Sequence, residues 1–99
     1  MTDVVILTEE QIKEQLKDLP GWKYADNKIS KEFEFDDFSG SLAFINSLES
    51  FFNDHDHHPD THIYYSKVVF ELQRFDVGGK VTDLDFVTAH KIEDSYKSK

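Results

Sequence analysis

The sequence predicts an α+β fold in which three helices pack on one face of a four-stranded antiparallel sheet, in the chain order α-β-β-α-β-β-α. Segments with helical periodicity and segments with strand periodicity follow one another in that order. Each expected strand pair is joined by a short turn, which favours antiparallel pairing. The 99 residues match the size of one hydrophobic core, so we expect a single domain over residues 1–99, without internal repeat or linker.

The first half of the chain predicts a helix and a hairpin. Residues 8–18 are expected to form a helix that starts at the capping box Thr8–Gln11 and stops at Pro20. Residues 21–24 predict a short strand that leads into a turn. Residues 28–35 then alternate between an apolar-rich face and a polar face, as in an antiparallel strand with one side toward solvent.

The second half repeats this order of elements. Residues 38–52 carry one apolar stripe at helical spacing and predict the central helix. Residues 61–65 and 68–75 are rich in β-branched and aromatic side chains and predict a second hairpin. Thr82 is a suitable N-cap for a last helix, and the polar residues 95–99 at its end are expected to fray.

The face of the sheet that the helices leave open predicts self-association. It is too apolar for a free surface and too polar for a core, and strand edges in so small a sheet favour pairing with another chain. We therefore expect a homo-oligomer, either a dimer or a dimer of dimers. The residues expected on this face are Ser30, Glu32, Glu34, Val69, Glu71, Gln73 and Phe75.

Composition excludes several classes of function. A formal net charge of −9 and a pI near 4.8 argue against binding to nucleic acid or to anionic lipid, both of which attract basic surfaces. The absence of cysteine excludes disulfides, thiolate catalysis and zinc–thiolate sites. No apolar run approaches a membrane span, and the first residues lack the basic start of a signal peptide, so we expect a soluble cytoplasmic protein.

The most unusual feature is a run of histidines. Four of the five histidines lie between positions 55 and 62, interleaved with carboxylates and followed by Pro59. A connecting loop is ordinarily made of Gly, Asn, Asp or Ser, so this composition indicates a functional site. Histidine is the side chain that exchanges protons most readily near neutral pH.

Three interpretations of the run remain open. It supplies imidazole and carboxylate groups for a metal, but it lacks a helical H-x-x-x-H pair and any finger-type spacing, so we expect no bound metal. The groups that would serve a metal are His55, His57, His58 and His62 with Asp54, Asp56 and Asp60.

The second interpretation is that some histidines of the run have a structural role only. His55 and His62 are expected to be ordinary solvated side chains.

Acid–base chemistry is the third interpretation. Adjacent His57 and His58 can point to different sides of an extended backbone, so that one imidazole donates a proton while another group accepts one. The serines lie outside any nucleophile elbow, and the chain has no Gly-rich phosphate loop. Proton transfer without a covalent intermediate is the chemistry that remains.

At the level of motifs, the chain resembles the pterin-4a-carbinolamine dehydratase family over nearly its whole length. The resemblance includes Trp22 after a Pro-Gly pair and the Phe35-x-x-Phe38 entry to the central helix. Its most specific part is the His-His-Pro core at this distance from the Tyr and the final Asp. The matching motifs are His57-His58-Pro59-Asp60, Tyr65-Ser66-Lys67-Val68, Asp76-Val77-Gly78-Gly79 and Thr82-x-x-Asp85.

The resemblance implies an activity and partners. Members of the family share the predicted order of elements, form dimers or dimers of dimers, and use no metal or organic cofactor. They dehydrate 4a-hydroxytetrahydropterin to quinonoid dihydropterin, which regenerates the tetrahydrobiopterin-type cofactor of aromatic amino acid hydroxylases. Some members also bind a homeodomain transcription factor as its dimerisation cofactor.

Site residues follow from the same resemblance. His57, His58 and Asp85 match the catalytic positions, although Asp85 also has a purely structural interpretation as a capping residue three positions after Thr82. Asn53 departs from the family pattern, which has an acid or another titratable group there. The positions that match the substrate-binding loops are Asp56, His57, His58, Pro59, Arg74, Phe75 and Asp76.

Phe75 is the second departure, because the family has a third histidine or a tryptophan there. An aromatic ring keeps a wall on which a pterin can stack but cannot exchange a proton. Two function classes therefore remain: a lyase, whose rate is reduced by Phe75 and Asn53, and a non-catalytic or weakly active pterin-binding or protein-interaction module. The intact His57-His58-Pro59 sequence favours the enzyme, and Phe75 favours the module.

Overall fold

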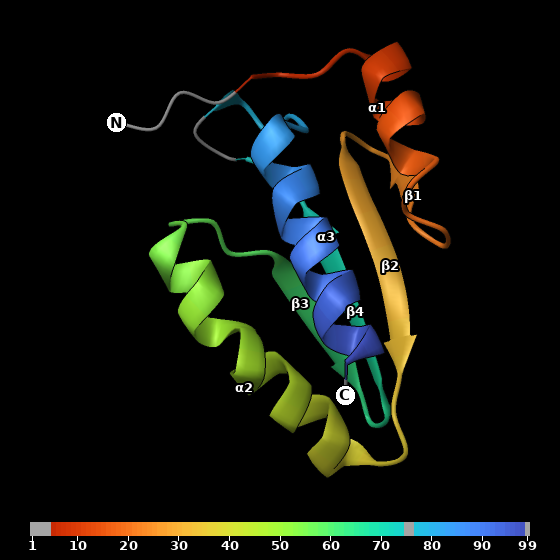
Figure 1. Cartoon of the computed structure of the whole chain (residues 1–99), viewed down its shortest axis with the longest axis vertical. Coiled ribbons are helices and arrows are strands. Elements are labelled where there is room, and N and C mark those ends of the chain that lie inside the picture. The colour runs from red at the N-terminus through yellow and green to blue at the C-terminus, as the bar shows by residue number, and fades with distance from the viewer. Residues whose placement is uncertain (1–4, 75–76, 99) are drawn as a thin grey trace.

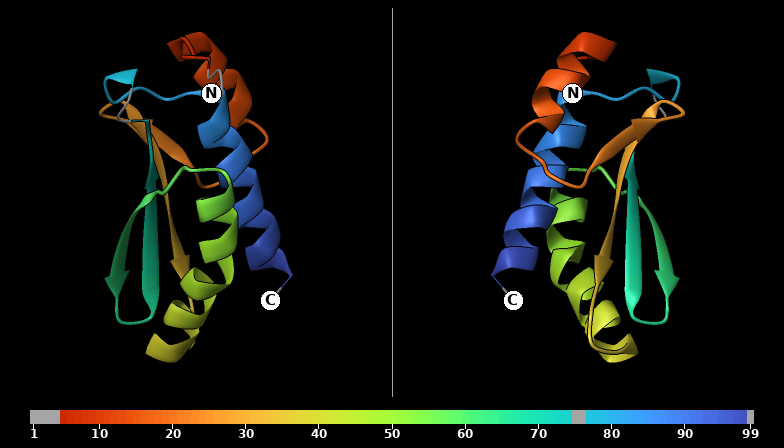
Figure 2. Two further views of the ribbon diagram at one scale, coloured as in Figure 1. Left: turned by 90° about the vertical axis from the view of Figure 1, so that its left-hand side faces the viewer. Right: turned by 90° about the vertical axis from the view of Figure 1, so that its right-hand side faces the viewer.

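Three helices cover one face of a four-stranded antiparallel sheet, which confirms the predicted fold class and order of elements (Figure 1). The computed structural model describes residues 5–74 and 77–98. The side views in Figure 2 show the sheet as one layer and the helices as the other. The elements are α1 (Glu9–Leu16), β1 (Lys23–Ala25), β2 (Lys28–Glu34), α2 (Phe38–Asp54), β3 (Asp60–Tyr64), β4 (Lys67–Leu72) and α3 (Asp83–Lys97).

The sheet has the strand order β1-β2-β4-β3, and all of its pairs are antiparallel. Ser30 lies opposite Glu71, and Glu32 lies opposite Val69, so these side chains share the face away from the helices. The intervening residues of β2 and β4 point toward the helices and form the buried layer of the sheet. That buried layer consists of Ile29, Phe33, Val68, Phe70 and Leu72.

Aromatic side chains join the sheet to α2 and α3. The ring centroid of Phe33 lies 6.1 Å from that of Phe44 and 4.9 Å from that of Tyr96. The hydroxyl of Tyr96 donates to the Glu34 carbonyl over 2.8 Å. The prediction that residues 95–99 fray is therefore wrong for Ser95, Tyr96 and Lys97, because the aromatic contacts hold α3 helical through Lys97.

A charged network lies beside the core at the opposite end of α3 from its N-cap. In the alternation of residues 28–35, Lys31 falls on the apolar-rich face. The structure explains why a lysine is found there. Its ammonium group pairs with Glu93 and donates to the Pro20 carbonyl over 3.0 Å. The indole N–H of Trp22 donates to the same Glu93 carboxylate over 2.9 Å, so this buried acid has two donors.

The hairpin formed by β3 and β4 ends earlier than predicted. β4 stops at Leu72, and a turn follows in which Gly78 and Gly79 have φ angles of 80° and 72°. These left-handed angles suit glycine, and Gly79 N–H donates to the Arg74 carbonyl over 2.8 Å. Phe75, which was predicted to end this strand, lies outside the described residues.

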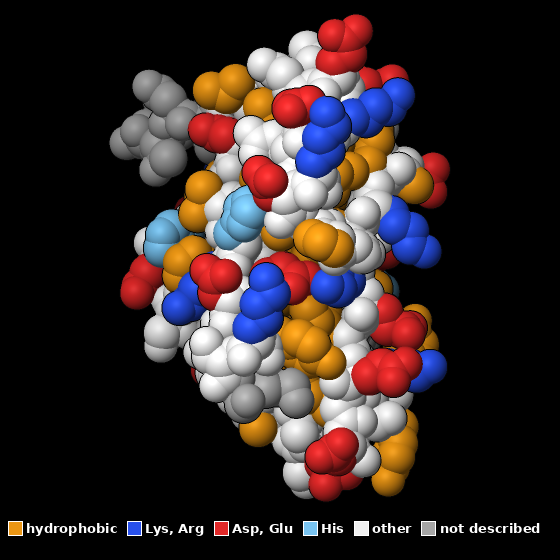
Figure 3. Space-filling model, turned by 45° about the vertical axis from the view of Figure 1, so that its right-hand side comes forward, with side chains coloured by type: hydrophobic (Ala, Val, Ile, Leu, Met, Phe, Trp, Pro, Cys, Tyr) orange, Lys and Arg blue, Asp and Glu red, His pale blue; other side chains and the backbone are white. Residues whose placement is uncertain are grey.

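Acidic and basic side chains are interspersed on the face shown in Figure 3, with hydrophobic side chains between them. Among the residues described, no helix has the length and apolar character that a bilayer crossing requires.

Candidate functional site

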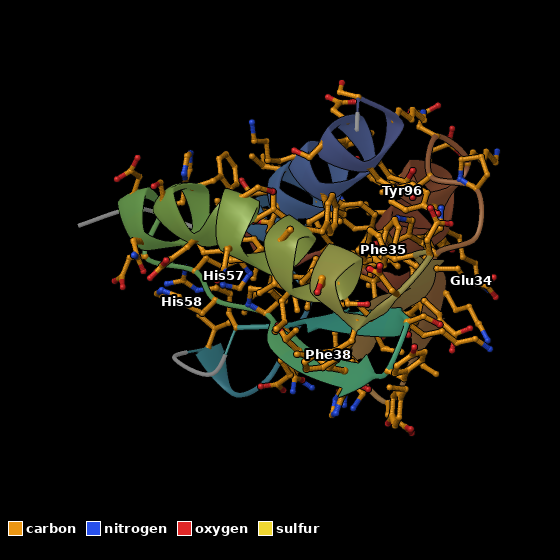
Figure 4. The ribbon with its side chains drawn as sticks, turned by 90° about the horizontal axis from the view of Figure 1, so that it is seen from below. Glu34, Phe35, Phe38, His57, His58 and Tyr96 are labelled. Carbon is orange, nitrogen blue, oxygen red and sulfur yellow. The ribbon has the colours of Figure 1, made fainter. Side chains whose placement is uncertain are left out.

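The histidine run forms the connection between the C-terminus of α2 and β3. The amide N–H of His57 donates to the Phe52 carbonyl over 3.1 Å, which closes the end of the helix. Asp56 has a φ of 47°, a left-handed conformation that Asp tolerates better than most residues. Pro59 then prevents helix from continuing and directs the chain into β3. Figure 4 shows both labelled histidines at this end of α2, far from Phe35 and Tyr96.

His57 points into the protein and meets Asp85 at the start of α3. Its Nε2 is hydrogen-bonded to Oδ1 of Asp85, and the two residues are 5% and 0% exposed. The other carboxylate oxygen, Oδ2, accepts from the amide N–H of Thr82 over 2.7 Å and from its hydroxyl over 3.2 Å. The capping interpretation of Asp85 is therefore confirmed: one oxygen caps α3, and the other is hydrogen-bonded to His57. A catalytic role for Asp85 stays a prediction.

His58 points the other way and meets the end of α2. Its Nε2 lies 2.8 Å from Oδ1 of Asn53, and the ring is exposed. The residue that departs from the family pattern is therefore the partner of the second histidine. The amide oxygen of Asn53 accepts a hydrogen bond from an N–H group, as a carboxylate oxygen would, but it carries no negative charge. Adjacent histidines thus have a charged, buried partner on one side and a neutral, exposed partner on the other.

A cavity of about 390 Å³, the histidine cavity, brings the two imidazoles together with Arg74 from the segment after β4. Most residues predicted to bind substrate lie here, while Asp85 stands behind His57 and is absent from the lining. Phe75 and Asp76, also predicted for this site, lie outside the described residues. The described residues that line the cavity are Asp56, His57, His58, Pro59, Asp60, Gln73 and Arg74.

Sequence reasoning missed Gln73 as a lining residue and expected it on the open face of the sheet. It placed Asp60 in the metal interpretation and in the His57-His58-Pro59-Asp60 motif, but not among the substrate-binding positions. The signal for Asp60 is its position directly after the His-His-Pro motif. Gln73 directly precedes Arg74, so once Arg74 is placed at the cavity its neighbour is a natural candidate.

His55 and His62 lie outside the histidine cavity, and both side chains are exposed. Nδ1 of His55 is 3.0 Å from the Phe51 carbonyl, and its ring stacks on that of Phe51. Nε2 of His62 is 3.0 Å from Oε1 of Glu71 across β3 and β4. This hydrogen bond is the main cause that lowers the pKa of Glu71 below its ordinary value; burial partly opposes it, and Lys28 adds to the lowering.

No group of three or more histidine and acidic side chains within residues 5–74 and 77–98 has the arrangement needed to hold a metal ion. The histidine and Asp85 pair has no third ligand near it in this range. That no metal binds here stays a prediction.

The arrangement favours proton transfer. With the Asp85 carboxylate accepting through both oxygens, Nε2 of His57 is the donor of their hydrogen bond, and Nδ1 is the ring nitrogen left for a ligand. By the same argument the Asn53 oxygen leaves Nδ1 of His58 available. None of the described residues that line the histidine cavity carries a hydroxyl or thiol that could act as a nucleophile.

Comparison with known proteins matches the sequence of this chain to one family. A family model described as pterin 4 alpha carbinolamine dehydratase matches residues 5–95. A Sulfurisphaera tokodaii protein provisionally named a pterin-4-alpha-carbinolamine dehydratase is 42% identical over 89% of this chain and 94% of its own length. A similarly named Saccharolobus solfataricus protein is 46% identical over 87% of this chain and 89% of its own length.

Solved structures agree with the sequence comparisons. A transcriptional coactivator/pterin dehydratase from Brucella melitensis superposes with a TM-score of 0.85 at 32% identity, covering 92% of this chain and 98% of that chain. A pterin dehydratase-like protein that is a RuBisCO assembly factor in the alpha-carboxysome shares the fold alone, with a TM-score of 0.63 at 16% identity over 77% of this chain and 92% of that chain. The family model spans almost the whole chain, and the chain belongs to the pterin 4 alpha carbinolamine dehydratase family.

Proposed function

We propose that this protein is a hydro-lyase that dehydrates the 4a-carbinolamine of a tetrahydropterin to the quinonoid dihydropterin. The observation that carries the proposal is that His57 and His58 line one cavity while each is oriented by its own partner, Asp85 or Asn53. The names of the relatives at 42% and 46% identity support the same reaction.

The reaction needs one proton delivered and one removed. Cleavage of the C4a–O bond releases the hydroxyl, which leaves as water once a proton reaches it. The lone pair on N5 then forms the C4a=N5 double bond, and the N5 proton is lost to a base. The protein ends in its starting protonation state after one proton exchange between its groups or with solvent.

His57 is the better candidate for the acid. With Nε2–H bonded to the Asp85 carboxylate, a proton on Nδ1 makes the ring a cation directly beside a buried anion. That proton is the one donated to the leaving hydroxyl. Removing such an acid–base group typically costs about 10²–10⁴ in rate.

His58 is the better candidate for the base. Its Nε2–H is directed at the neutral Asn53 oxygen, so Nδ1 keeps a lone pair that can accept the N5 proton. Arg74 supplies a cationic side chain to the same cavity, where a guanidinium can donate to the carbonyl oxygen of the pterin ring.

Two departures from the family pattern predict a slower enzyme. Asn53 gives His58 a neutral partner, and Phe75 replaces a residue that is a histidine or tryptophan in the family. Replacing Phe75 with histidine tests the second departure directly: the rate rises if a missing third histidine limits catalysis, and it stays the same or falls if stacking on Phe75 matters more.

The alternative function is a non-catalytic or weakly active pterin-binding or protein-interaction module. The fold is shared with a protein that is a RuBisCO assembly factor, and another structural relative carries a coactivator name. The exposed side chains of Ile63, Tyr64 and Tyr65 at the end of the β3–β4 hairpin are consistent with a protein contact. A partner such as a transcription factor belongs to this alternative.

We also propose a homo-oligomer, a dimer or dimer of dimers, in the cytoplasm, acting beside an aromatic amino acid hydroxylase without metal or organic cofactor. Every residue of the edge strand β3 is exposed, which supports pairing with another chain. Light scattering at micromolar concentration is expected to give at least twice the monomer mass, and a monomer would contradict the proposal.

A stopped-flow assay tests the activity. The 4a-carbinolamine is generated in the presence and absence of the protein, and formation of the quinonoid product is followed by absorbance. The lyase proposal expects a first-order rate that rises with protein concentration. A rate equal to that of buffer at every concentration would leave the interaction module as the function.

A further inference from the structure

The chain uses a capping box twice, once at the surface and once in the core. At α1 the amide N–H of Thr8 donates to the side-chain oxygen of Gln11 over 2.9 Å, and both residues are exposed. At α3 the equivalent pair is Thr82 and Asp85, and both residues are 0% exposed. A cap stabilises a helix start at the surface as well as in the core, whereas a buried carboxylate is costly unless hydrogen bonds satisfy its oxygens. Capping alone therefore does not explain why the box of α3 is buried.

Thr82 supplies two donors to one oxygen of Asp85. Its amide N–H donates to Oδ2 over 2.7 Å, and its hydroxyl lies 3.2 Å from the same oxygen. An ionised carboxylate has no proton to give, so the hydroxyl is the donor. Two donors from one buried residue restrict the rotation of the carboxylate, and the other oxygen, Oδ1, stays directed at Nε2 of His57.

The N-terminal segment holds Thr82 in place. Residues 5–7 run beside the residues that precede α3 and form an isolated antiparallel bridge with Thr82 (Figure 1). Val81 and Asp83, the neighbours of Thr82, make the two backbone hydrogen bonds of this bridge, over 3.0 and 3.1 Å. The N–H of Thr82 therefore stays out of the bridge and is directed at Asp85 instead.

The orientation of the Asp85 carboxylate decides which nitrogen of His57 keeps a proton. A neutral imidazole has two tautomers, and its neighbours select one of them. When His57 has given its Nδ1 proton to a leaving hydroxyl, the neutral ring must keep the proton on Nε2. Oδ1 of Asp85 accepts that proton in a hydrogen bond only while the carboxylate faces the ring.

We propose that Thr82 is a positioning residue for His57: its amide and hydroxyl hold the Asp85 carboxylate so that the imidazole keeps its proton on Nε2 and presents Nδ1 to the histidine cavity. The inference rests on the proposed function, in which His57 is the acid. Thr82 is absent from the residues that line the cavity, so it acts through Asp85 and His57 and does not touch a ligand there.

Kinetics of two substitutions test the role of the hydroxyl. Thr82→Val removes the hydroxyl with little change in shape, and Thr82→Ser keeps it. For Thr82→Val, kcat for dehydration is expected to fall by about 10-fold, the lower end of the loss seen when the partner of a functional histidine is disturbed. KM should stay native, because Thr82 does not line the cavity. Thr82→Ser should recover most of the native kcat.

Thr88→Val is the matched control. Thr88 is also fully buried on α3, but its hydroxyl donates to the Leu84 carbonyl over 3.0 Å. This variant should lose stability to urea, as Thr82→Val does, while its kcat stays native. An equal loss of kcat in the two valine variants would assign the effect to a general loosening of α3 and would overturn the inference.

Nitrogen-15 NMR of the imidazole rings measures the tautomer directly and needs no substrate. At a pH high enough for the ring to be neutral, His57 of the native protein should carry its proton on Nε2 alone. Thr82→Val should shift part of the population to the Nδ1 tautomer, whereas Thr82→Ser and Thr88→Val should keep the native spectrum. The signals of His57 are identified by their absence from His57→Ala.

Two further results would overturn the inference while the lyase stands: a native kcat in Thr82→Val, or a Thr82→Ser variant that is as slow as Thr82→Val. Failure of the lyase proposal is distinct, because the native protein would then accelerate no dehydration, and the NMR measurement alone decides. A redistribution of the His57 tautomers in Thr82→Val supports the positioning role, and an unchanged tautomer contradicts it.

The native protein provides a measurement that does not depend on the folding of Thr82→Val. The hydroxyl proton of Thr82 is compared by NMR with that of Thr8, which is exposed. Exchange with solvent is expected to be slower for Thr82, because its hydroxyl is buried and donates to Asp85. Equal exchange rates for the two hydroxyl protons would contradict the inference.

Discussion

His57 and His58 are neighbours in the chain but occupy two different environments. His57 is 5% exposed and is held by a carboxylate that itself caps a helix. His58 is exposed and is held by the neutral side chain of Asn53. Two chemically identical side chains thus differ in partner and in burial, and the different roles proposed for them follow from that difference.

A third histidine shows that a carboxylate partner alone is insufficient. His62 is bonded to Glu71 over 3.0 Å, an ordinary hydrogen-bond distance, yet it lies on the open face of the sheet. His57 differs because its partner is fully buried and its ring lines a cavity. His57, the proposed acid, therefore differs from His62 in two ways besides having a carboxylate partner: its hydrogen bond is buried, and its ring lines a cavity.

The largest expected effect follows from removing either imidazole of the site. His57→Ala and His58→Ala should each lower kcat for dehydration by about 10²–10⁴-fold, the usual contribution of a proton-transfer group. The two variants should differ in stability. His57→Ala leaves a buried oxygen of Asp85 without its partner, which costs about 1–3 kcal/mol, whereas the exposed His58→Ala should stay within about 0.5 kcal/mol.

Urea denaturation measures this difference, and stopped-flow absorbance measures the rates. Equal stability of the two alanine variants would show that the His57–Asp85 bond contributes nothing to the fold. Native rates in either variant would remove that histidine from the mechanism.

The next effect follows from neutralising the partner of His57. Asp85→Asn keeps the shape of the side chain but removes the charge beside the imidazole, so kcat should fall by about 10–100-fold, as when the partner that orients a functional histidine is lost. KM should change little, because Asp85 is absent from the cavity lining. Steady-state kinetics at several pH values separates the two parameters, and a change confined to KM would argue against an effect through His57.

A smaller effect, in the opposite direction, follows from giving His58 a charged partner. Asn53→Asp should raise kcat by only a few-fold, about the difference between a neutral and a charge-assisted hydrogen bond at an exposed site. The rise is expected because a carboxylate makes His58 a stronger base than the neutral amide does. Asn53→Leu, which has no acceptor, is the matched control and should reduce the rate; an equal response to both substitutions would show that Asn53 does not orient His58.

The smallest effect concerns the surface pair. The pKa of Glu71 is lowered in the folded protein, first by His62, so its ionised form adds stability at pH values above about 4.5. That contribution is lost as the pH falls below this value through the folded pKa. Glu71→Gln should therefore flatten the acid side of the stability curve, measured by thermal denaturation between pH 3 and 7 in roughly half-unit steps.

Glu32→Gln provides the control for this measurement, since Glu32 is exposed and lies on the same face of the sheet. Dehydration rates of Glu71→Gln and of His62→Gln should stay native at neutral pH. A large loss of rate in either variant would place the surface pair in the mechanism.

The sequence predicted the fold well because its signals are local. The capping boxes at Thr8 and Thr82 and the alternation of residues 28–35 correspond to α1, α3 and β2. Errors arose where tertiary contacts dominate: Tyr96 is polar by sequence pattern, but its ring packs on Phe33 and extends α3. The position of Lys31 on the apolar-rich face of its strand is likewise explained only by its ion pair with Glu93, which is 62 residues away in the chain.

The site was predictable in part for the same reason. His57, His58 and Pro59 stand together in the chain, so their composition alone indicated a site. The pairing of His57 with Asp85 spans 28 residues, and no local pattern shows which oxygen of a capping carboxylate is left for a second partner.

The central claim is that His57 and Asp85 act as one unit and that His58 acts apart from Asp85. A double-mutant cycle measures this most directly, using stopped-flow kcat/KM for the native protein, Asp85→Asn, His57→Ala, His58→Ala and the two double variants. The account predicts that Asp85→Asn has little further effect in the His57→Ala background but its full effect in the His58→Ala background. A full effect of Asp85→Asn in the absence of His57 would contradict the claim.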